Sequence, residues 1–244
     1  MSKKTKAEER AARAAAALAE RKRKERRRNI LTVIGVVAVM VLIVVVGVLV
    51  NQARDEGEDE QATASSEYEL TIGPDDAPHT IVIYEDFLCP VCQAVEDATR
   101  DDLARLADEG KVQVSYRPFN LFQDPPLQDY SVASAAAFAV VQDESGDEVA
   151  KKFHDLLYEN QPPESGPYPD ADWLVDLAVE AGADESDVRD GIEGGDGNAW
   201  VEAATEAASS RGINSTPTIY LDGEQFQDGR TLEELASNLV AAVS

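Results

Sequence analysis

The stretch Tyr84-Glu85-Asp86-Phe87-Leu88-Cys89-Pro90-Val91-Cys92-Gln93 contains the only two cysteines of the 244-residue chain. An apolar, β-branched run over 80–84 leads into it, and a helical pattern of apolar residues begins directly after Cys92. The pair is therefore expected at a strand-to-helix junction, with Pro90 in the first helical turn, where its fixed φ suits a helix. Cys89 would lie at the helix N-terminus, where backbone N–H groups and the helix dipole favour a thiolate.

A spacing of two residues brings the two sulfurs close enough to form a disulfide, and we interpret the pair as a redox dithiol. Three alternatives stay open. A structural disulfide usually closes a longer loop than this one. A zinc site needs further ligands, and the remaining candidates, His79 and His154, are far apart in the sequence, so we expect no metal. The third alternative is a pair of unreactive core thiols.

A second motif, Ile213-Asn214-Ser215-Thr216-Pro217-Thr218-Ile219-Tyr220-Leu221-Asp222-Gly223, lies near the C-terminus. With the cysteine motif it resembles the DsbA-like branch of the thioredoxin superfamily, over residues 68–244. In that family a cis proline preceded by Thr, Val or Ser begins a strand and faces the cysteine pair, which Thr216-Pro217 matches. The resemblance implies a thioredoxin-like α/β fold with an inserted helical subdomain, here about residues 124–210. It also implies a protein thiol:disulfide oxidoreductase that needs no cofactor beyond its own Cys89–Cys92 disulfide.

Within that resemblance, Cys89 exchanges disulfides with a client, Cys92 closes the internal bridge, and Thr216 and Pro217 bind the client segment. The sequence departs from the family in two places. Pro90-Val91 stands between the cysteines in place of Pro-His, and the buried acid found six residues before the first cysteine in many relatives is replaced by Ile83.

Glu85 is our candidate to replace that acid in proton transfer, because a strand period of two puts it on the same face as Ile83. Asp86 is expected to face the other way. The alternative is that either acid is simply solvated. We interpret His79 and His154 as surface or packing residues, and Trp173 and Trp200 as core anchors of the helical insert.

The hydrophobic pattern predicts strands over 68–72, 80–84 and 112–117, with the active-site helix continuing over 95–107. Such a β-α-β order favours parallel strands with a right-handed crossover. A hairpin is predicted over 218–227 and a closing helix over 231–243, with Thr231 and Glu234 as a capping box. The insert is expected to contain helices over 130–141, 147–158, 170–181 and 198–210, separated by loops such as 161–169 and 191–197.

Charge is divided sharply along the chain. Residues 1–28 contain twelve Lys or Arg and four Glu, a net charge of +8, so the rest carries −33 within a total of −25. A domain this acidic is repelled by phosphates, which argues against nucleic acid binding.

Ile30 to Val50 holds no charged residue and would span roughly 31 Å as a helix, enough to cross a bilayer. We predict a basic cytoplasmic tail (1–28), a single-pass transmembrane helix (29–50), an acidic flexible linker (51–67) and an extracytoplasmic domain (68–244), oriented by the positive-inside rule. The alternative, a cleaved signal peptide, usually has a shorter apolar run.

These features predict a membrane-anchored oxidoreductase that introduces disulfides into exported cysteine-containing proteins. A DsbB-like or VKOR-like membrane partner would reoxidise it, as the resemblance implies. Two alternatives remain: a reductase or isomerase of the same fold, and a non-catalytic binding or chaperone module.

Overall fold

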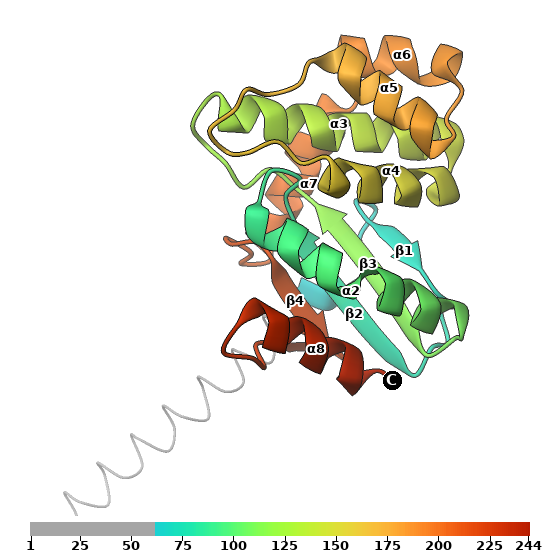
Figure 1. The fold of residues 1–244 in the computed structure, drawn as a ribbon, viewed down its shortest axis with the longest axis vertical. Coiled ribbons are helices and arrows are strands. Elements are labelled where there is room, and N and C mark those ends of the chain that lie inside the picture. Colours follow the sequence, from blue (N-terminus) through green and yellow to red (C-terminus); the bar gives the residue numbers. More distant parts are fainter. Residues whose placement is uncertain (1–61) are drawn as a thin grey trace, which may run out of the picture. The chain divides into compact units, whose positions relative to one another are not determined.

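The computed structural model describes residues 62–244 (Figure 1). Three predicted segments lie outside the described residues: the basic tail, the predicted transmembrane helix and residues 51–61 of the linker. Within 62–244 no helix combines the length and the apolar character that crossing a membrane requires.

The core of the described chain is a five-stranded sheet with the strand order β1-β3-β2-β4-β5. The central strands β2 and β3 are parallel, and the other neighbouring pairs are antiparallel. The predicted β-α-β unit and the C-terminal hairpin are therefore confirmed. The strands are β1 (Leu70–Ile72), β2 (His79–Glu85), β3 (Val112–Pro118), β4 (Thr218–Leu221) and β5 (Glu224–Gln225).

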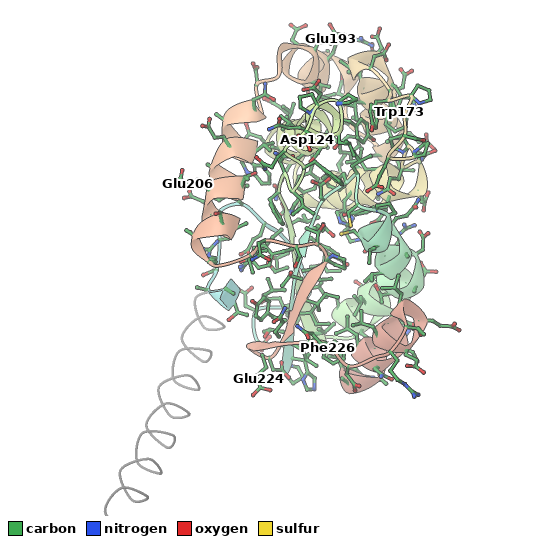
Figure 2. The ribbon with its side chains drawn as sticks, turned by 90° about the vertical axis from the view of Figure 1, so that its left-hand side faces the viewer. Asp124, Trp173, Glu193, Glu206, Glu224 and Phe226 are labelled. Carbon is green, nitrogen blue, oxygen red and sulfur yellow. The ribbon has the colours of Figure 1, made fainter. Side chains whose placement is uncertain are left out.

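Helices cover both faces of this sheet. Helix α2 (Pro90–Asp108) connects β2 to β3 and packs beside the C-terminal helix α8 (Leu232–Ala242) on one face, while α7 (Asn198–Ser210) lies on the other (Figures 1 and 2). Strands β2 and β3 carry buried residues on both faces, as expected for strands between two helical layers. This arrangement places the N-terminus of α2 at the carboxyl end of β2.

The helical insert between β3 and β4 consists of α3 (Leu127–Ser145), α4 (Asp147–Glu159), α5 (Ala171–Ala181), α6 (Glu185–Gly194) and α7. Four of these helices were predicted, but α6 was not, and the predicted loop over 191–197 is wrong because 191–194 complete α6. Within α6 only Val188 and Ile192 are buried, too few apolar positions to give a clear helical period. Trp173 and Trp200 are partly buried and pack against the core, as predicted.

The folded domain begins earlier than predicted, because residues 62–66 are held against the sheet. Ala62 is fully buried, and its carbonyl oxygen accepts hydrogen bonds from Tyr84 Oη at 2.6 Å and Arg117 Nη1 at 2.8 Å. Arg117 Nη2 donates to the Ala64 carbonyl at 2.9 Å. The assignment of these residues to a flexible linker is therefore wrong: the backbone carbonyls satisfy a buried guanidinium, a tertiary contact that composition does not reveal.

Candidate dithiol site

Cys89 is the N-cap of α2, and Pro90 occupies the first helical position, as predicted. The loop that leads into the helix is tight, since the Cys89 backbone N–H donates to the Asp86 carbonyl at 2.9 Å. Phe87 and Leu88 in this loop are buried and pack in the core, so they offer no exposed apolar surface. The strand-to-helix junction predicted for the cysteine pair is therefore confirmed.

The prolyl loop lies beside Cys89. The Thr216–Pro217 peptide bond is cis, as the resemblance implied, and β4 begins at the next residue. Because Thr218 is paired with Tyr84 across β4 and β2, the loop meets the start of α2. Cys89 Sγ lies 3.6 Å from the Thr216 carbonyl oxygen. Two segments 127 residues apart thus form one site.

The two thiols differ in their electrostatic surroundings. The hydrogen bond from the Cys92 thiol, aided by the Thr216 side chain and the backbone N–H groups at the helix start, overcomes burial and lowers the pKa of Cys89 to about 6. The Thr216 hydroxyl is buried and has no other hydrogen-bond partner. Burial and the bond to Cys89 raise the pKa of Cys92 well above its ordinary value. Near neutral pH the reduced pair therefore holds an anion on Cys89 and a proton on Cys92.

Glu85 and Asp86 are both buried, so the alternative of solvated acids is wrong for both. The Asp86 carboxylate accepts hydrogen bonds from the backbone N–H groups of Leu88 and Leu121, each at 2.8 Å, and from Ser131 Oγ at 2.5 Å. Burial nevertheless raises the pKa of Asp86. Glu85 has a different partner: its Oε1 lies 2.7 Å from His154 Nε2 on α4. Asp86 thus secures the loop before Cys89, whereas Glu85 faces the insert.

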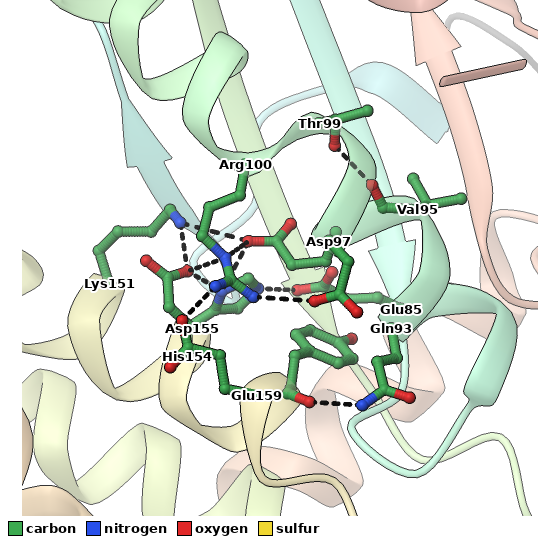
Figure 3. A network of polar contacts seen from close by, with 12 residues as sticks. Glu85, Gln93, Val95, Asp97, Thr99, Arg100, Lys151, His154, Asp155 and Glu159 are labelled. Atoms are coloured by element: carbon green, nitrogen blue, oxygen red, sulfur yellow. Dashed lines mark hydrogen bonds and ion pairs between the residues drawn. The ribbon is translucent and has the colours of Figure 1, made fainter. Parts of the chain in front are cut away.

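His154 belongs to a cluster of charged side chains between α2 and α4 (Figure 3). Its Nδ1 lies 3.0 Å from Asp155 Oδ1 and 3.7 Å from Glu96 Oε1. Lys151 and Arg100 also pair with Glu96 and Asp155. His154 is buried among packed side chains, as predicted. The prediction did not foresee its charge or its carboxylate partners. His79 is half-exposed and pairs with Asp222 at 2.8 Å, in line with a surface role.

The only signal of this cluster in the sequence is the pairing of opposite charges four residues apart, Glu96 with Arg100 and Lys151 with Asp155. Such pairs normally lie on exposed helix faces, which explains why the pattern did not indicate a buried site.

The ligand atoms of Glu96, His154 and Asp155 lie within 4.8 Å of one another, a spacing that a metal ion can use. However, Lys151 Nζ is 2.5 Å from Asp155 Oδ1 and 3.5 Å from Glu96 Oε1. These acids therefore already face positive charge, and the donor set fits an ion-pair cluster better than a metal centre.

Comparison with solved structures agrees with this geometry. The reduced form of the disulfide bond oxidoreductase DsbG from Mycobacterium tuberculosis is 28% identical, with a TM-score of 0.64, over 76% of this chain and 90% of that one. Reduced DsbA from the same organism is 26% identical, with a TM-score of 0.59, over 72% of this chain and all of that one.

Sequence relatives include the "Na(+)/H(+) antiporter NhaA 1" of Salinispora arenicola, which is 27% identical over 70% of this chain. The match covers 24% of the antiporter, so this chain spans about a quarter of that relative's length. The "Probable disulfide bond formation protein D" of Bacillus cereus is 24% identical over 72% of this chain and 78% of that protein.

The predicted resemblance to DsbA-like oxidoreductases is thus confirmed. A family model described as Thioredoxin matches residues 65–240, which is most of the chain, and the chain therefore belongs to the thioredoxin family.

Proposed function

We propose that this protein is a thiol–disulfide oxidoreductase that acts through Cys89 and Cys92. The observation that carries the proposal is the opposed ionisation of the two thiols: Cys89 has a pKa lowered to about 6, whereas the pKa of Cys92 is raised. Only a thiolate attacks or leaves readily in disulfide exchange, so this opposition assigns a separate role to each sulfur. The names of the solved relatives describe the same class of reaction.

In the oxidising direction, a client thiolate attacks Cys89 Sγ of the Cys89–Cys92 disulfide. The bond between the two cysteines breaks, and its electron pair leaves with Cys92. A second client thiolate then attacks the client sulfur of the mixed disulfide, and Cys89 leaves as a thiolate. The client loses two electrons and gains a disulfide, and the protein gains two electrons as a dithiol, with the reaction requiring no further cofactor.

Thr216 and Pro217 are proposed to hold the client. The Thr216 carbonyl lies next to Cys89 Sγ, so an extended client segment that pairs with this loop would place its own sulfur beside Cys89. Val91, which is 38% exposed, adds apolar surface at the same edge.

We place the reaction outside the cytoplasm and tether it to the membrane by the uncharged run 30–50. The basic residues before that run and the acidic residues after it support this orientation. Clients would be exported proteins with cysteine pairs, and a DsbB-like or VKOR-like membrane protein would reoxidise Cys89 and Cys92. The name of the Bacillus cereus relative, "Probable disulfide bond formation protein D", supports an oxidising role.

The reduction potential of the Cys89/Cys92 couple tests whether the protein oxidises or reduces its clients. A thiolate with a pKa of about 6 stabilises the reduced form less than in DsbA and more than in thioredoxin. We therefore expect a potential, measured in equilibrium with glutathione, above the roughly −270 mV of thioredoxin and below the roughly −120 mV of DsbA. A value of about −270 mV or lower would favour the reductase and contradict the oxidase.

Cys89→Ala tests whether the protein acts through exchange at all. We expect this variant to lose oxidation of a reduced, unfolded client, measured by alkylation of the client's remaining thiols. A deletion strain in which Cys89→Ala still restored exported disulfide proteins would support a non-catalytic binding module and contradict our proposal.

A further inference from the structure

Gln161 is a polar side chain of the helical insert that reaches the loop carrying Cys89. Its Nε2 atom donates to two backbone carbonyl oxygens of that loop, Phe87 O at 2.9 Å and Cys89 O at 3.1 Å. An amide nitrogen carries two hydrogens, so one side chain can serve both carbonyls. Disulfide exchange uses neither carbonyl, and the contact joins positions 74 and 72 residues apart, so the two hydrogen bonds require an explanation of their own.

The backbone at Gln161 has little freedom of its own. Gln161 lies two residues after the end of α4, and its N–H donates to the Tyr158 carbonyl at 3.2 Å. The next residue, Pro162, is buried, and a proline restricts the residue before it to extended conformations. The side chain of Gln161 therefore starts from a fixed point on the insert, from which it can hold the two carbonyls in place.

The loop over 86–89 is held in two different ways. Asp86 closes the loop on itself, because its carboxylate accepts from the Leu88 N–H at 2.8 Å and its carbonyl accepts from the Cys89 N–H at 2.9 Å. The carbonyls of Phe87 and Cys89 instead accept from Gln161, outside the loop. Gln161 thus connects the backbone of the loop to the insert.

The Cys89 carbonyl is also the point at which α2 begins. It accepts the first hydrogen bond of the helix, from the Gln93 N–H at 3.1 Å. The same turn directs the backbone N–H groups of Val91 and Cys92 towards the Cys89 sulfur. By holding this carbonyl as well, Gln161 keeps the turn, and the donors that face the sulfur, in one orientation. Gln161 acts on the sulfur through the backbone and does not touch it.

This support matters most when the internal bridge is open. In the disulfide form, the bond between Cys89 and Cys92 itself restrains the first turn of α2, as a cross-link restrains the loop that it closes. In the structure both cysteines are free thiols, so the turn depends on noncovalent contacts such as those of Gln161. Gln161 should therefore stabilise the reduced form more than the oxidised form.

We propose that Gln161 is a positioning residue that holds the Cys89 backbone in the reduced protein and thereby raises the reduction potential of the Cys89/Cys92 couple. The proposal rests on the proposed exchange at these two cysteines. It gives the helical insert a part in setting how strongly the protein oxidises its clients, because a more stable reduced form makes the disulfide form a stronger oxidant.

The test compares the wild-type protein with Gln161→Met, which has a side chain of similar length but no donor. Full-length protein is equilibrated with mixtures of reduced and oxidised glutathione, and the oxidised fraction is measured by acid quenching and alkylation. Two glutathione molecules supply two electrons and two protons to open the bridge, and they leave as one disulfide. We expect the equilibrium constant for reduction to fall about fivefold in the variant, the effect of one neutral hydrogen bond that acts only in the reduced form.

Gln93→Met is the matched control. The Gln93 side chain also joins α2 to the insert, because its Nε2 donates to the Tyr158 carbonyl at 2.8 Å (Figure 3). It donates to neither loop carbonyl, and the substitution leaves the backbone N–H of residue 93 in place. This variant should have the wild-type equilibrium constant. An equal fall in both variants would show that the contact between α2 and α4 matters as a whole, and would refute the assignment to Gln161.

Urea denaturation of the oxidised and reduced forms separates positioning from general stability. Gln161→Met should lower the free energy of unfolding more in the reduced form than in the oxidised form. An equal loss in both forms, with an unchanged equilibrium constant, would mean that Gln161 is merely structural and would overturn the proposal. The same curves show whether the variant is folded; if it is not, Gln161→Ala removes the donor without adding a large apolar group, and the same outcomes apply.

The wild-type protein alone tests the function on which this role depends. If it does not exchange with glutathione through Cys89 and Cys92, the proposed function fails, and this is seen before any variant is compared. If it exchanges and Gln161→Met has the wild-type equilibrium constant, only the role of Gln161 is disproved.

Discussion

Helix α2 carries two polar sites, and they stabilise charge in different ways. At its N-terminus the Cys89 anion is stabilised by uncharged donors: the Cys92 thiol, the Thr216 side chain and backbone N–H groups. Further along, Glu96 and Arg100 take part in a cluster in which acids and cations alternate across the contact with α4. The first site holds a single negative charge with no cation beside it. The second site holds opposite charges that stabilise one another as ion pairs.

The difference shows how one helix serves exchange and stability separately. The anion at Cys89 exists only in the reduced state, so its stabilisation favours the reduced state over the disulfide. The cluster contains no cysteine, so opening or closing the disulfide adds none of its charges and removes none. It depends on every partner, because a buried charge without its partner is costly. Changes at the helix start should therefore alter redox behaviour, whereas changes in the cluster should alter stability.

The largest expected effect is the loss of stability in His154→Leu, which leaves Glu85 buried without its cation. We expect the free energy of unfolding to fall by about 3–5 kcal/mol, measured by urea denaturation. The double variant Glu85→Leu/His154→Leu removes both charges and should recover part of the loss. If the free energy of unfolding of His154→Leu were within about 1 kcal/mol of the wild-type value, the buried Glu85 would not depend on His154 for its stabilisation.

The second prediction is that His154 and Cys89 contribute to folding stability with opposite dependence on pH. Folding raises the pKa of His154 from about 6.5 to about 9, so its stabilising effect is complete below pH 6.5 and is lost as pH rises through 9. Folding lowers the pKa of Cys89 from 9 to about 6, so the stabilising effect of its thiolate is complete above pH 9 and is lost as pH falls through 6. Oxidised protein has no Cys89 thiol to titrate.

From pH 6.5 to 9 the oxidised form should therefore lose stability, by up to about 3 kcal/mol, while the reduced form loses less or gains. Urea denaturation of both forms across this range measures the difference. If the free energy of unfolding changed with pH in the same way in the oxidised and reduced forms, the Cys89 thiolate would not stabilise the folded protein separately from His154.

A smaller effect concerns the Cys89 anion itself. Its rate of alkylation by iodoacetamide should have a midpoint near pH 6 and change little between low and high salt, because uncharged donors are not screened. Val91→His places an imidazole beside the thiolate and should lower the midpoint by about one unit in a salt-dependent way. A wild-type midpoint near 9 would mean that the helix start does not stabilise the thiolate.

The smallest effect is expected at the far end of α2. Arg105 pairs with Asp102 and Glu109, and all three side chains are about half exposed. Arg105→Ala should change the free energy of unfolding by no more than about 0.5 kcal/mol, since exposed ion pairs contribute little. A loss of several kcal/mol would show that charge pairs on α2 matter regardless of burial.

Much of the fold was predictable because its signals are local. Pro90 after Cys89 marked the start of α2, and the Asp222-Gly223 turn marked the β4–β5 hairpin. Thr231 was correctly predicted as the cap of α8, where its Oγ1 accepts from the Glu234 N–H at 3.1 Å. The Glu234 carboxylate, however, accepts from the Arg230 N–H at 2.9 Å, one residue earlier than a capping box requires.

Errors arose where the chain depends on distant contacts. Helix α6 has few apolar residues and forms against α3, and residues 62–66 are ordered by Arg117, more than fifty positions later. Neither contact leaves a periodic pattern in the sequence.

The sequence by itself determined the cysteine pair, its place at the start of a helix, the prolyl motif and the division of charge, because each depends on neighbouring residues or on composition. Only the tertiary structure decided which charged side chains meet in the interior next to β2 and α2. Glu85, Glu96 and His154 come from β2, α2 and the inserted α4, and they act on one another only because folding brings them together in a low-dielectric interior. There a charge is governed by its nearest partners in space, which the order of residues does not specify.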